Sequence, residues 1–282
     1  MIAPQLETYI ATQVAQAIAE DVNGGDLTVM LIPEARTGEA TVITRVAMII
    51  CGRPWFDAVF QQISPKVRVE WRLQEGMACE SGQTLCSIAG PARAMLTGER
   101  TALNFLQTLS ATATLTKRYV DAIRGTRAVI VDTRKTLPGL RLAQKYAVRI
   151  GGGTNHRIGL YDGVLIKENH IMAAGGVVIA LRQAQQHSPA GVPIQIEVET
   201  LAQLSDALNA GAKMILLDNF DLAKMREAVT INAGRATLEA SGGVNLDTVR
   251  AIAETGVDRI SIGALTKDIQ AIDLSMRIQM AN

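Results

Sequence analysis

After residue 125 the hydrophobic positions recur in short runs, and amphipathic segments with helical spacing separate these runs. Strands that alternate with helices in this way predict a parallel sheet with helices outside it. No glycine-rich nucleotide-binding pattern follows the first run, and six successive strand–helix units favour a (β/α) barrel, complete or partly open, over a doubly wound sheet. The six runs are residues 128–131, 163–166, 194–198, 214–217, 237–240 and 259–262.

Before residue 125 the pattern differs, because its apolar stretches are rich in β-branched residues or alternate strictly with polar ones. We expect residues 1 to about 90 to form a small α+β unit. A long helical region over residues 92–123 follows, and we expect a break near Ser110. The other expected helices cover 1–20 and 55–63, and the expected strands cover 40–46, 67–73 and 83–88.

The composition is globular, with 48% hydrophobic and 20% charged residues and a net charge of +1. The near-neutral charge argues against a nucleic acid or a membrane surface as the main partner, and no apolar run approaches a membrane span. Nothing at the N-terminus resembles a signal peptide, and Cys51, Cys79 and Cys86 have no CxxC or zinc spacing. We interpret these cysteines as small buried hydrophobes of a cytoplasmic protein. A catalytic thiol is the alternative, which no histidine motif supports.

Basic residues are concentrated between Arg134 and Lys167, where seven of them accompany a single acid, Asp162. Several of these charges stand at the ends of apolar runs, where a buried cation must be paired or must serve a ligand. Their convergence suggests a multiply anionic small molecule. Three of the seven have the spacing of an exposed helical stripe and are expected to be solvated. These three are Arg141, Lys145 and Arg149.

Polar residues also follow the predicted barrel strands at the ends where barrels bind their ligands. Glu197 and Asp218 lie one strand apart at this rim. Two facing carboxylates can hold Mg²⁺, contact ribose hydroxyls or stabilise an oxocarbenium-like charge, and the alternative is that they pair with surrounding cations. His156 follows three glycines; a lone histidine is more often structural, but beside Arg157 it can meet a substrate carboxylate.

The last two predicted strands end in small turns, Ser241-Gly242-Gly243 and Ile262-Gly263-Ala264, and each turn leads into a helix. Backbone N–H groups of such turns cradle a phosphate, and barrels often bind one there. With the cations and the two acids, these turns indicate a site for a phosphorylated sugar that carries pyrophosphate and for an acidic acceptor.

Eight motifs along the chain resemble those of the quinolinate phosphoribosyltransferase family, the carboxylating nicotinate-nucleotide pyrophosphorylases. The resemblance extends from the N-terminal helix to Leu274-Ser-Met-Arg277, and the motifs in this order are highly specific. They are Gly98-Glu-Arg-Thr-Ala-Leu-Asn104, Asp132-Thr-Arg-Lys-Thr136 with Pro138-Gly139, Asn155-His-Arg157, Leu165-Ile-Lys-Glu-Asn-His170, Glu197-Val-Glu199, Leu217-Asp-Asn-Phe220, Ser241-Gly-Gly243 and Gly263-Ala-Leu-Thr266.

The resemblance implies an α/β protein with an N-terminal α/β sandwich domain, residues 1–110, which a C-terminal helix at 266–282 joins. An incomplete (β/α) barrel of six or seven strands follows at residues 111–265. The implied reaction transfers the phosphoribosyl group of 5-phosphoribosyl 1-pyrophosphate to quinolinate, with Mg²⁺ as cofactor. Its products are nicotinate mononucleotide, pyrophosphate and CO₂, in de novo NAD biosynthesis. The implied assembly is a cytoplasmic homodimer with shared active sites, or a hexamer.

The resemblance also implies residue roles. Lys135, Glu197 and Asp218 are catalytic; Lys135 and Lys167 face the pyrophosphate, and the two acids face the ribose and Mg²⁺, which they hold largely through substrate and water. Arg100 reaches the site from the partner subunit. The implied ligands of the quinolinate carboxylates are Arg100, Arg134, His156, Arg157 and Lys167, and the substrate-binding set also contains Thr133, Ser241, Gly242, Gly243, Ile262, Gly263 and Ala264. Lys267 has no assigned role.

Two rival functions remain open on sequence alone. A related phosphoribosyltransferase-like protein, such as the molybdenum-transport-associated paralogue, would take another acceptor, although the motifs at 155–157 and 167–170 argue against it. A catalytically silent barrel that acts as a binding or sensor protein is the other rival. Retention of both Glu197 and Asp218 beside the cations argues against a silent barrel, and a turnover assay separates the two.

Overall fold

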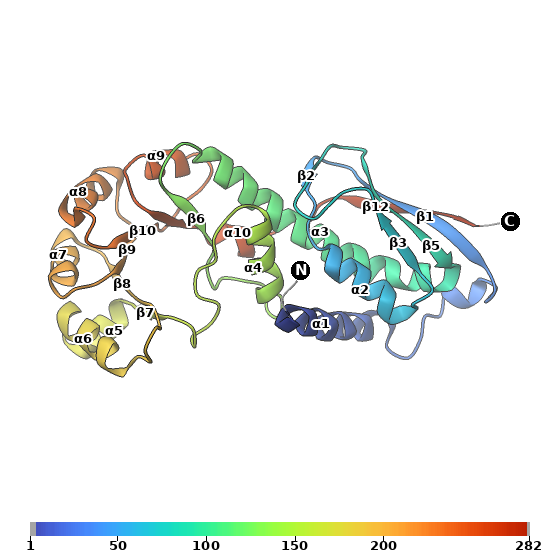
Figure 1. Ribbon diagram of the computed structural model, residues 1–282, viewed down its shortest axis with the longest axis horizontal. Helices are drawn as coiled ribbons and strands as arrows, with labels where there is room; N and C mark the ends of the chain where they lie inside the picture. The colour runs from blue at the N-terminus through green and yellow to red at the C-terminus, as the bar shows by residue number, and fades with distance from the viewer. Residues whose placement is uncertain (1–3, 281–282) are drawn as a thin grey trace. The chain divides into compact units, whose positions relative to one another are not determined.

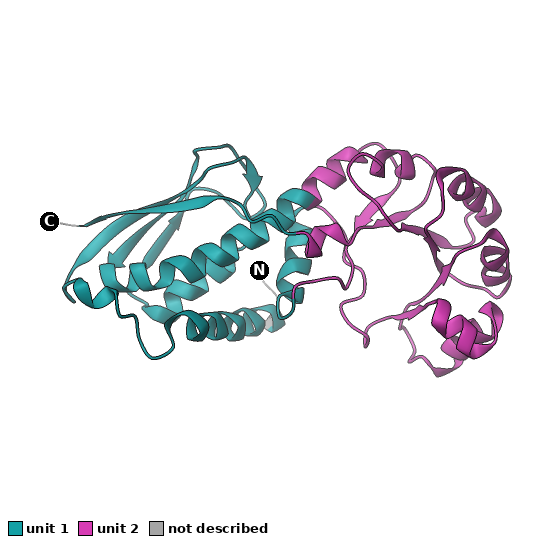
Figure 2. Ribbon diagram, turned by 180° about the vertical axis from the view of Figure 1, so that it is seen from behind, with its two compact units in different colours: residues 1–115, 138–151, 269–282 teal, residues 116–137, 152–268 magenta. Residues whose placement is uncertain are grey.

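The computed structural model describes residues 4–280, and its chain divides into two compact units. Unit 1 comprises the residues up to 115, residues 138–151 and the residues from 269 onward, whereas unit 2 comprises residues 116–137 and 152–268 (Figure 2). The chain therefore crosses between the units several times. The segment 138–151 belongs to unit 1, although the domain division expected from the sequence places it in the barrel.

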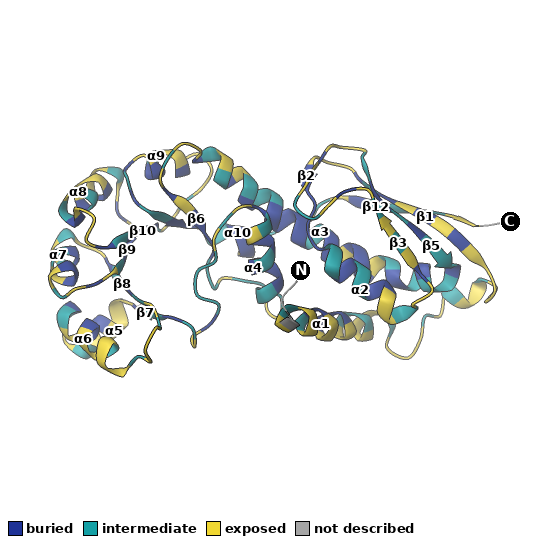
Figure 3. Cartoon of the chain, viewed as in Figure 1, coloured by how far each residue is buried: buried dark blue, intermediate teal, exposed yellow. Residues whose placement is uncertain are grey.

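Unit 1 is built on a four-stranded antiparallel sheet in the order β12-β1-β5-β3. Along β1 exposed and buried positions alternate, and the buried Ala40 and Val42 face the core (Figure 3). Helices cover this face of the sheet (Figure 1), and the large side chains of Trp55, Phe56 and Phe60 are fully buried between the layers. The strands are β1 (Thr37–Thr44), β2 (Met48–Ile49), β3 (Arg68–Trp71), β4 (Ala78–Cys79), β5 (Thr84–Pro91) and β12 (Leu274–Met280), and the helices are α1 (Pro4–Val22), the 3₁₀ helix η1 (Val29–Leu31), α2 (Arg53–Ile63), α3 (Ala92–Ala122) and α4 (Arg141–Ile150).

The C-terminal segment corrects one prediction, because it forms a strand and not the helix expected at 266–282. Only the short α10 (Ala264–Lys267) is helical there, and β12 pairs with β1 in a register that places Met276 opposite Val42. Apolar residues alternate along β12, as a strand with one covered face requires. Residues 281–282 of the predicted helix, like residues 1–3 of the predicted first helix, lie outside the described residues.

The long helix α3 is continuous, so the break predicted near Ser110 is wrong. The Ser110 hydroxyl accepts a hydrogen bond from the Cys51 N–H and donates one to the Cys51 carbonyl, both at 3.0 Å. The side chain therefore satisfies the backbone of a neighbouring segment instead of competing with the backbone of its own helix.

The predicted solvent stripe on α4 is wrong at its centre, because Lys145 is only 2% exposed. Arg149 is exposed as expected, and Arg141 is half-buried. The helix packs on more than one side, since Ala143, Ala147 and Val148 are also buried. A stripe with a spacing of four residues therefore does not lie entirely in solvent.

Unit 2 contains a six-stranded parallel sheet in the order β6-β11-β10-β9-β8-β7, which confirms all six predicted strands and the α/β class. Among the described residues the sheet ends at β6 and β7, and the curved sheet has its helices outside (Figure 1). The strands are β6 (Val129–Val131), β7 (Val164–Ile166), β8 (Ile194–Val198), β9 (Met214–Asp218), β10 (Thr237–Ser241) and β11 (Arg259–Ser261), and the helices are α5 (Glu168–Ala174), α6 (Val177–His187), α7 (Leu201–Asn209), α8 (Leu222–Asn232), α9 (Val249–Ala253) and α10.

The three cysteines are buried and free, as predicted. Burial raises the pKa of the Cys79 thiol to about 11 and also raises the pKa of Cys51 and of Cys86. These thiols therefore stay protonated and unreactive near neutral pH. Across residues 4–280, every helix is too short or too polar to cross a membrane.

Candidate active site

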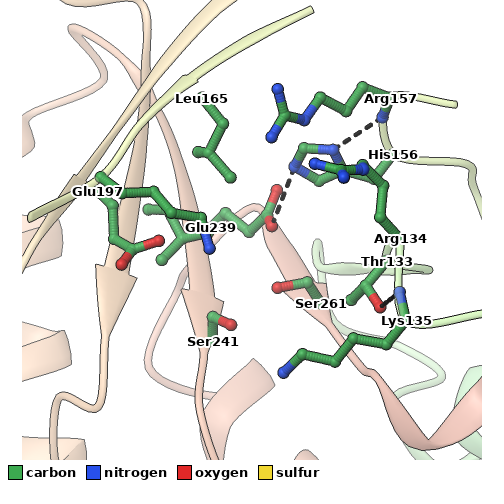
Figure 4. A pocket seen from close by; sticks show the side chains of 12 residues that line it. Thr133, Arg134, Lys135, His156, Arg157, Leu165, Glu197, Glu239, Ser241 and Ser261 are labelled. Carbon is green, nitrogen blue, oxygen red and sulfur yellow. Dashed lines mark hydrogen bonds and ion pairs between the residues drawn. The ribbon is translucent and has the colours of Figure 1, made fainter. Parts of the chain in front are cut away.

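A cavity opens at the carboxyl ends of the unit 2 strands, and side chains from the ends of most of these strands line it (Figure 4). Strand alternation explains the lining, because inward positions recur every second residue and the intervening residues pack under the helices. In β8, for example, Glu197 lines the cavity while Ile196 and Val198 are fully buried. The lining residues are Thr133, Arg134, Lys135, His156, Arg157, Leu165, Lys167, Glu197, Leu216, Glu239, Ser241 and Ser261.

Four cations share this cavity, namely Arg134, Lys135, Arg157 and Lys167. Burial lowers the pKa of the Arg157 guanidinium from its usual value, and the positive charge of Arg134 lowers it further. Arg157 Nη1 donates to the Gly163 carbonyl at 2.9 Å, which fixes the guanidinium at the start of β7. The structure thus brings like charges together without an equal number of acids, as an anion-binding site requires.

The loop that carries His156 and Arg157 is held by the fully buried Asp132, which follows β6. One carboxylate oxygen accepts the Asn155 side-chain amide at 2.6 Å, and the other accepts the His156 N–H at 2.8 Å. The loop also runs beside β6 through a bridge between Thr154 and Val131. Asp132 therefore positions the cation loop against the first strand of the sheet.

The imidazole of His156 has two identified partners. Its Nδ1 accepts the Arg157 N–H at 2.7 Å, and its Nε2 lies 2.8 Å from the Gln195 side-chain oxygen. Because a backbone N–H can only donate, Nδ1 carries no proton and Nε2 is the N–H of a neutral ring. His156 is 13% exposed at its side chain, and its ring lies against the floor of the cavity (Figure 4).

Glu197 and Asp218 stand at the ends of neighbouring strands, β8 and β9. Burial raises the pKa of Glu197, and the negative charge of Asp218 raises it further, whereas Lys167 lowers it. The charge of Asp218 therefore acts on Glu197 from the neighbouring strand. Among the described residues no group of three or more metal-ligating acids, histidines or cysteines exists, so a cation here would need further ligands from elsewhere.

The two glycine turns end β10 and β11. Gly242 has φ = 103°, and a β-carbon on it would lie 2.1 Å from Asn219 Oδ1. Asn219 itself has φ = 55°; its side-chain amide donates to Asp218 Oδ2 at 3.0 Å and its backbone N–H donates to the Ser241 carbonyl at 3.0 Å. Asn219 thus joins the Asp218 carboxylate to the turn that starts at Ser241.

The second turn lies beside the lysine loop. A β-carbon on Gly263 would lie 3.1 Å from Lys135 Cδ and 3.7 Å from Lys267 Cε. The Thr266 hydroxyl donates to the Lys135 carbonyl at 2.8 Å, so the helix after this turn holds the loop after β6. Both lysine stems therefore pass over Gly263, and a β-carbon there would press on the Lys135 stem. Six predicted residues stand at the same strand ends but are not part of the cavity lining: Asp218, Gly242, Gly243, Ile262, Gly263 and Ala264.

Arg100 is the one predicted site residue that belongs to unit 1. It is exposed on α3 and is not among the residues that line the cavity.

Sequence reasoning missed Glu239, Ser261 and the adjoining Gln195. Glu239 and Gln195 are buried, and each stands two residues before a strand-end residue that was selected, Ser241 and Glu197. The period of two that places Glu197 and Ser241 inside the barrel would also have placed these residues there.

Comparison with known proteins gives the class of the molecule. Residues 26–110 match the "Quinolinate phosphoribosyl transferase, N-terminal domain" and residues 112–277 match the "Quinolinate phosphoribosyl transferase, C-terminal domain". A "Probable nicotinate-nucleotide pyrophosphorylase [carboxylating]" of Bacillus subtilis is 39% identical over 93% of this chain and 91% of its own length. A "Nicotinate-nucleotide pyrophosphorylase [carboxylating]" of Mycobacterium leprae is 41% identical over 93% of this chain and 95% of its own length.

A solved nicotinate-nucleotide pyrophosphorylase from Francisella tularensis superposes with a TM-score of 0.94 at 42% identity, over 99% of this chain and 98% of that one. Fold, cation cluster and strand-end acids together define a phosphoribosyltransferase with an α/β barrel unit. Within that class, the chain belongs to the quinolinate phosphoribosyltransferase family, as the sequence motifs predicted.

Proposed function

We propose that the cavity of unit 2 is the active site at which quinolinate is joined to 5-phosphoribosyl 1-pyrophosphate. The activity of the chain is that of its family, a carboxylating nicotinate-nucleotide pyrophosphorylase that produces nicotinate mononucleotide in NAD biosynthesis. The observation that carries the location is the convergence of four cations and the strand-end acid Glu197 on one cavity, with Asp218 at the end of the neighbouring strand.

The acceptor is assigned to the arginine side of the cavity. Quinolinate carries two adjacent carboxylates, and Arg134, Arg157 and Lys167 supply three cationic donors for them. Repulsion between Arg134 and Arg157, which contributes to the lowered pKa of Arg157, is relieved when a dianion enters. His156 belongs to this side as a neighbour of Arg157.

The donor is assigned to the opposite side, with its 5′-phosphate at the two glycine turns and its pyrophosphate at Lys135 and Lys167. The turns contribute backbone N–H groups from Ser241 to Gly243 and from Ile262 to Ala264. Two features support the assignment: Lys135 passes over Gly263, and Asn219 ties the first turn to Asp218.

The reaction then follows from these positions. The pyridine nitrogen attacks the anomeric carbon as the bond to pyrophosphate breaks, and positive charge that develops on the ribose is stabilised by Glu197 and Asp218. Lys135 neutralises charge that accumulates on the leaving pyrophosphate. As CO₂ leaves, the electron pair of the broken C–C bond stays on the ring carbon, where the positive charge of the quaternised nitrogen stabilises it, and a proton from water then takes the place of the carboxylate.

Mg²⁺ fits this donor set. It is typically held by one or two carboxylates together with substrate phosphates and water, and Glu197 with Asp218 supplies such a pair. When bound, the ion neutralises the pyrophosphate and orients it. Removal of divalent ions with a chelator is expected to abolish turnover while quinolinate binding to the arginine side persists in calorimetry. Full turnover in the chelated protein would contradict the metal assignment.

The acceptor assignment predicts discrimination between one carboxylate and two. Nicotinate lacks the carboxylate next to the ring nitrogen, and loss of one charge-assisted contact costs about 1.5–3 kcal/mol, or roughly 10- to 150-fold in kcat/KM. Steady-state kinetics with both acids measures this ratio. Comparable turnover of nicotinate and quinolinate would contradict a site built for two adjacent carboxylates.

We propose further that the protein is at least a homodimer in which Arg100 completes the site of the partner subunit. Its exposure on α3 and its absence from the cavity lining support a role toward a second copy. A two-fold dimer makes such an exchange reciprocal. The competing explanation is that Arg100 is an ordinary surface residue whose ion pairs contribute at most about 1 kcal/mol.

Subunit mixing tests the shared site. Inactive Arg100→Ala chains are mixed with inactive Lys135→Ala chains, and mixed dimers should regain one intact site with activity well above either parent. The matched control mixes Lys135→Ala with Asp218→Asn, whose lesions both lie in unit 2, so no site is restored. If native mass spectrometry shows exchange and the Arg100 pair stays inactive, the shared-site model is wrong.

A further inference from the structure

The barrel interior next to the cavity is polar, whereas a barrel interior is ordinarily filled with apolar side chains. Gln195 on β8 is 3% exposed, and Glu239 on β10 is 0% exposed. Arg259 on β11 stands opposite Glu239 in the strand register, and its Nε lies 3.3 Å from Glu239 Oε2. Buried polar groups need partners, so the arrangement of these side chains is fixed by which atoms donate and which accept.

The direction of each contact follows from the carboxylate. Glu239 faces Arg259 with its carboxylate oxygen Oε2, and the same oxygen accepts the amide N–H₂ of the Gln195 side chain at 3.2 Å. The oxygen of the Gln195 side chain then faces His156 Nε2 at 2.8 Å. Nε2 must therefore carry the proton, which leaves Nδ1 free to accept the Arg157 N–H at 2.7 Å.

We infer that Glu239, acting through Gln195, is a positioning residue that sets the tautomer of His156 and thereby the backbone of Arg157. Three contacts link Arg259 to His156 through Glu239 and Gln195, and the Arg157 N–H to His156 Nδ1 makes the fourth. A second contact supports the same direction, since Glu239 Oε1 lies 3.7 Å from His156 Nε2 and favours a proton on that nitrogen (Figure 4).

The inference changes the role of His156. Both ring nitrogens are engaged by the protein, so the ring does not need to bind the acceptor in order to matter. Its contribution is to hold the Arg157 N–H while Arg157 Nη1 holds the Gly163 carbonyl. The functional consequence rests on the proposed acceptor role of Arg157, whereas the tautomer itself does not.

The tautomer can be measured directly, because the chain has only three histidines. Nitrogen-15 NMR of the imidazole rings distinguishes Nε2–H from Nδ1–H, and the His156 signal is assigned by its loss in His156→Gln. The wild-type protein is expected to show the Nε2–H form alone. Gln195→Leu removes the relay but keeps the Glu239–Arg259 pair, and is expected to give a mixture of tautomers with KM for quinolinate raised about tenfold.

Two further variants complete the test. Glu239→Gln can donate as well as accept, so the Gln195 amide loses its fixed direction and the tautomer mixture should appear again. Ser261→Ala is the matched control, because Ser261 lines the same cavity but lies outside the relay, and it should leave His156 in the Nε2–H form. KM for the phosphoribosyl donor should change less than twofold in Gln195→Leu.

The inference is overturned if wild-type His156 carries its proton on Nδ1, or if folded Gln195→Leu and Glu239→Gln keep the wild-type tautomer. A changed tautomer with an unchanged KM for quinolinate would support the relay and contradict the proposed acceptor role of Arg157. The two failures are therefore distinguishable, and circular dichroism shows which variants are folded.

Discussion

The turn at Gly242 gives the sharpest single perturbation of the donor side, because Gly242→Ala meets two separate obstacles. Its φ of 103° is a conformation that L-residues rarely adopt and that costs about 1–3 kcal/mol outside glycine. Its new β-carbon would also lie 2.1 Å from Asn219 Oδ1 and 3.2 Å from the Asn219 backbone nitrogen. The Asn219 amide must therefore leave its contact with Asp218.

Loss of a hydrogen bond to a charged group adds about 1.5–3 kcal/mol, so the two costs together give roughly 2.5–6 kcal/mol at this rim. Part of this free-energy cost lowers the stability of the fold, and part weakens binding and reaction of the phosphoribosyl donor. We expect kcat/KM for the phosphoribosyl donor to fall about 100-fold or more, which corresponds to roughly 2.7 kcal/mol, while quinolinate binding changes little. Donor-dependent steady-state kinetics and urea unfolding measure the two parts.

Gly243→Ala is the matched control, because Gly243 has φ = 60° and nothing lies within 4 Å of its added β-carbon. It should cost only about 1 kcal/mol, from its left-handed backbone. A second test is the double variant Asn219→Gly with Gly242→Ala, in which the clash with the Asn219 side chain is gone and the two losses should be less than additive. Equal losses in the two alanine variants, or strict additivity in the double variant, would refute this account of the turn.

The other predictions concern separate features. Burial and the charge of Asp218 raise the pKa of Glu197, so activity that needs its carboxylate should fall as the pH drops through this raised value. In a profile of activity against pH, Asp218→Asn should move the acidic limb of the residual activity to lower pH. Because the pKa of Glu197 is raised in the folded protein, its ionisation lowers the free energy of unfolding as the pH rises. Glu197→Gln should remove this loss, and a plot of the free energy of unfolding against pH that runs parallel to that of wild type would contradict the sign. Arg157→Lys loses the Nη1 contact with Gly163 and the planar fork, and should raise KM for quinolinate at least tenfold with little change in donor KM, whereas a change confined to the donor would reverse the assignment. Truncation after Ile272 removes β12 and uncovers β1, so thermal unfolding should begin well below the wild-type temperature, and an unchanged transition would show that β12 is not needed.

The fold was predictable where the local pattern decided the structure. Each strand of unit 2 is a short apolar run between turns. Such a run identifies a buried parallel strand from the local sequence, without knowledge of the strand with which it pairs. Residues 274–280 were mistaken for a helix because their pairing partner, β1, lies at the other end of the chain. Ser110 was mistaken for a helix breaker because its partner is the backbone of Cys51, which the local sequence around Ser110 does not reveal.

The candidate site was predictable at the strand ends and not beneath them. Asp218 follows an apolar run and Glu197 is the second-last residue of one, so position alone places both at the rim. Glu239 stands inside such a run, where a charge is unexpected, and its meaning depends on Arg259 and Gln195 in two other strands. Lys145 has the spacing of a solvated charge, and only the packing of α4 on several sides shows that it is buried.

The central claim is that the cavity of unit 2 carries out phosphoribosyl transfer coupled to loss of the carboxylate next to the ring nitrogen. It is tested most directly by a single turnover with quinolinate labelled with carbon-13 in that carboxylate, in the presence of the phosphoribosyl donor and Mg²⁺. We expect one labelled CO₂ for each pyrophosphate and each nicotinate mononucleotide, and none of the three products in Lys135→Ala. Release of label without the donor, a nucleotide product that retains the label, or full turnover in Lys135→Ala would contradict the account.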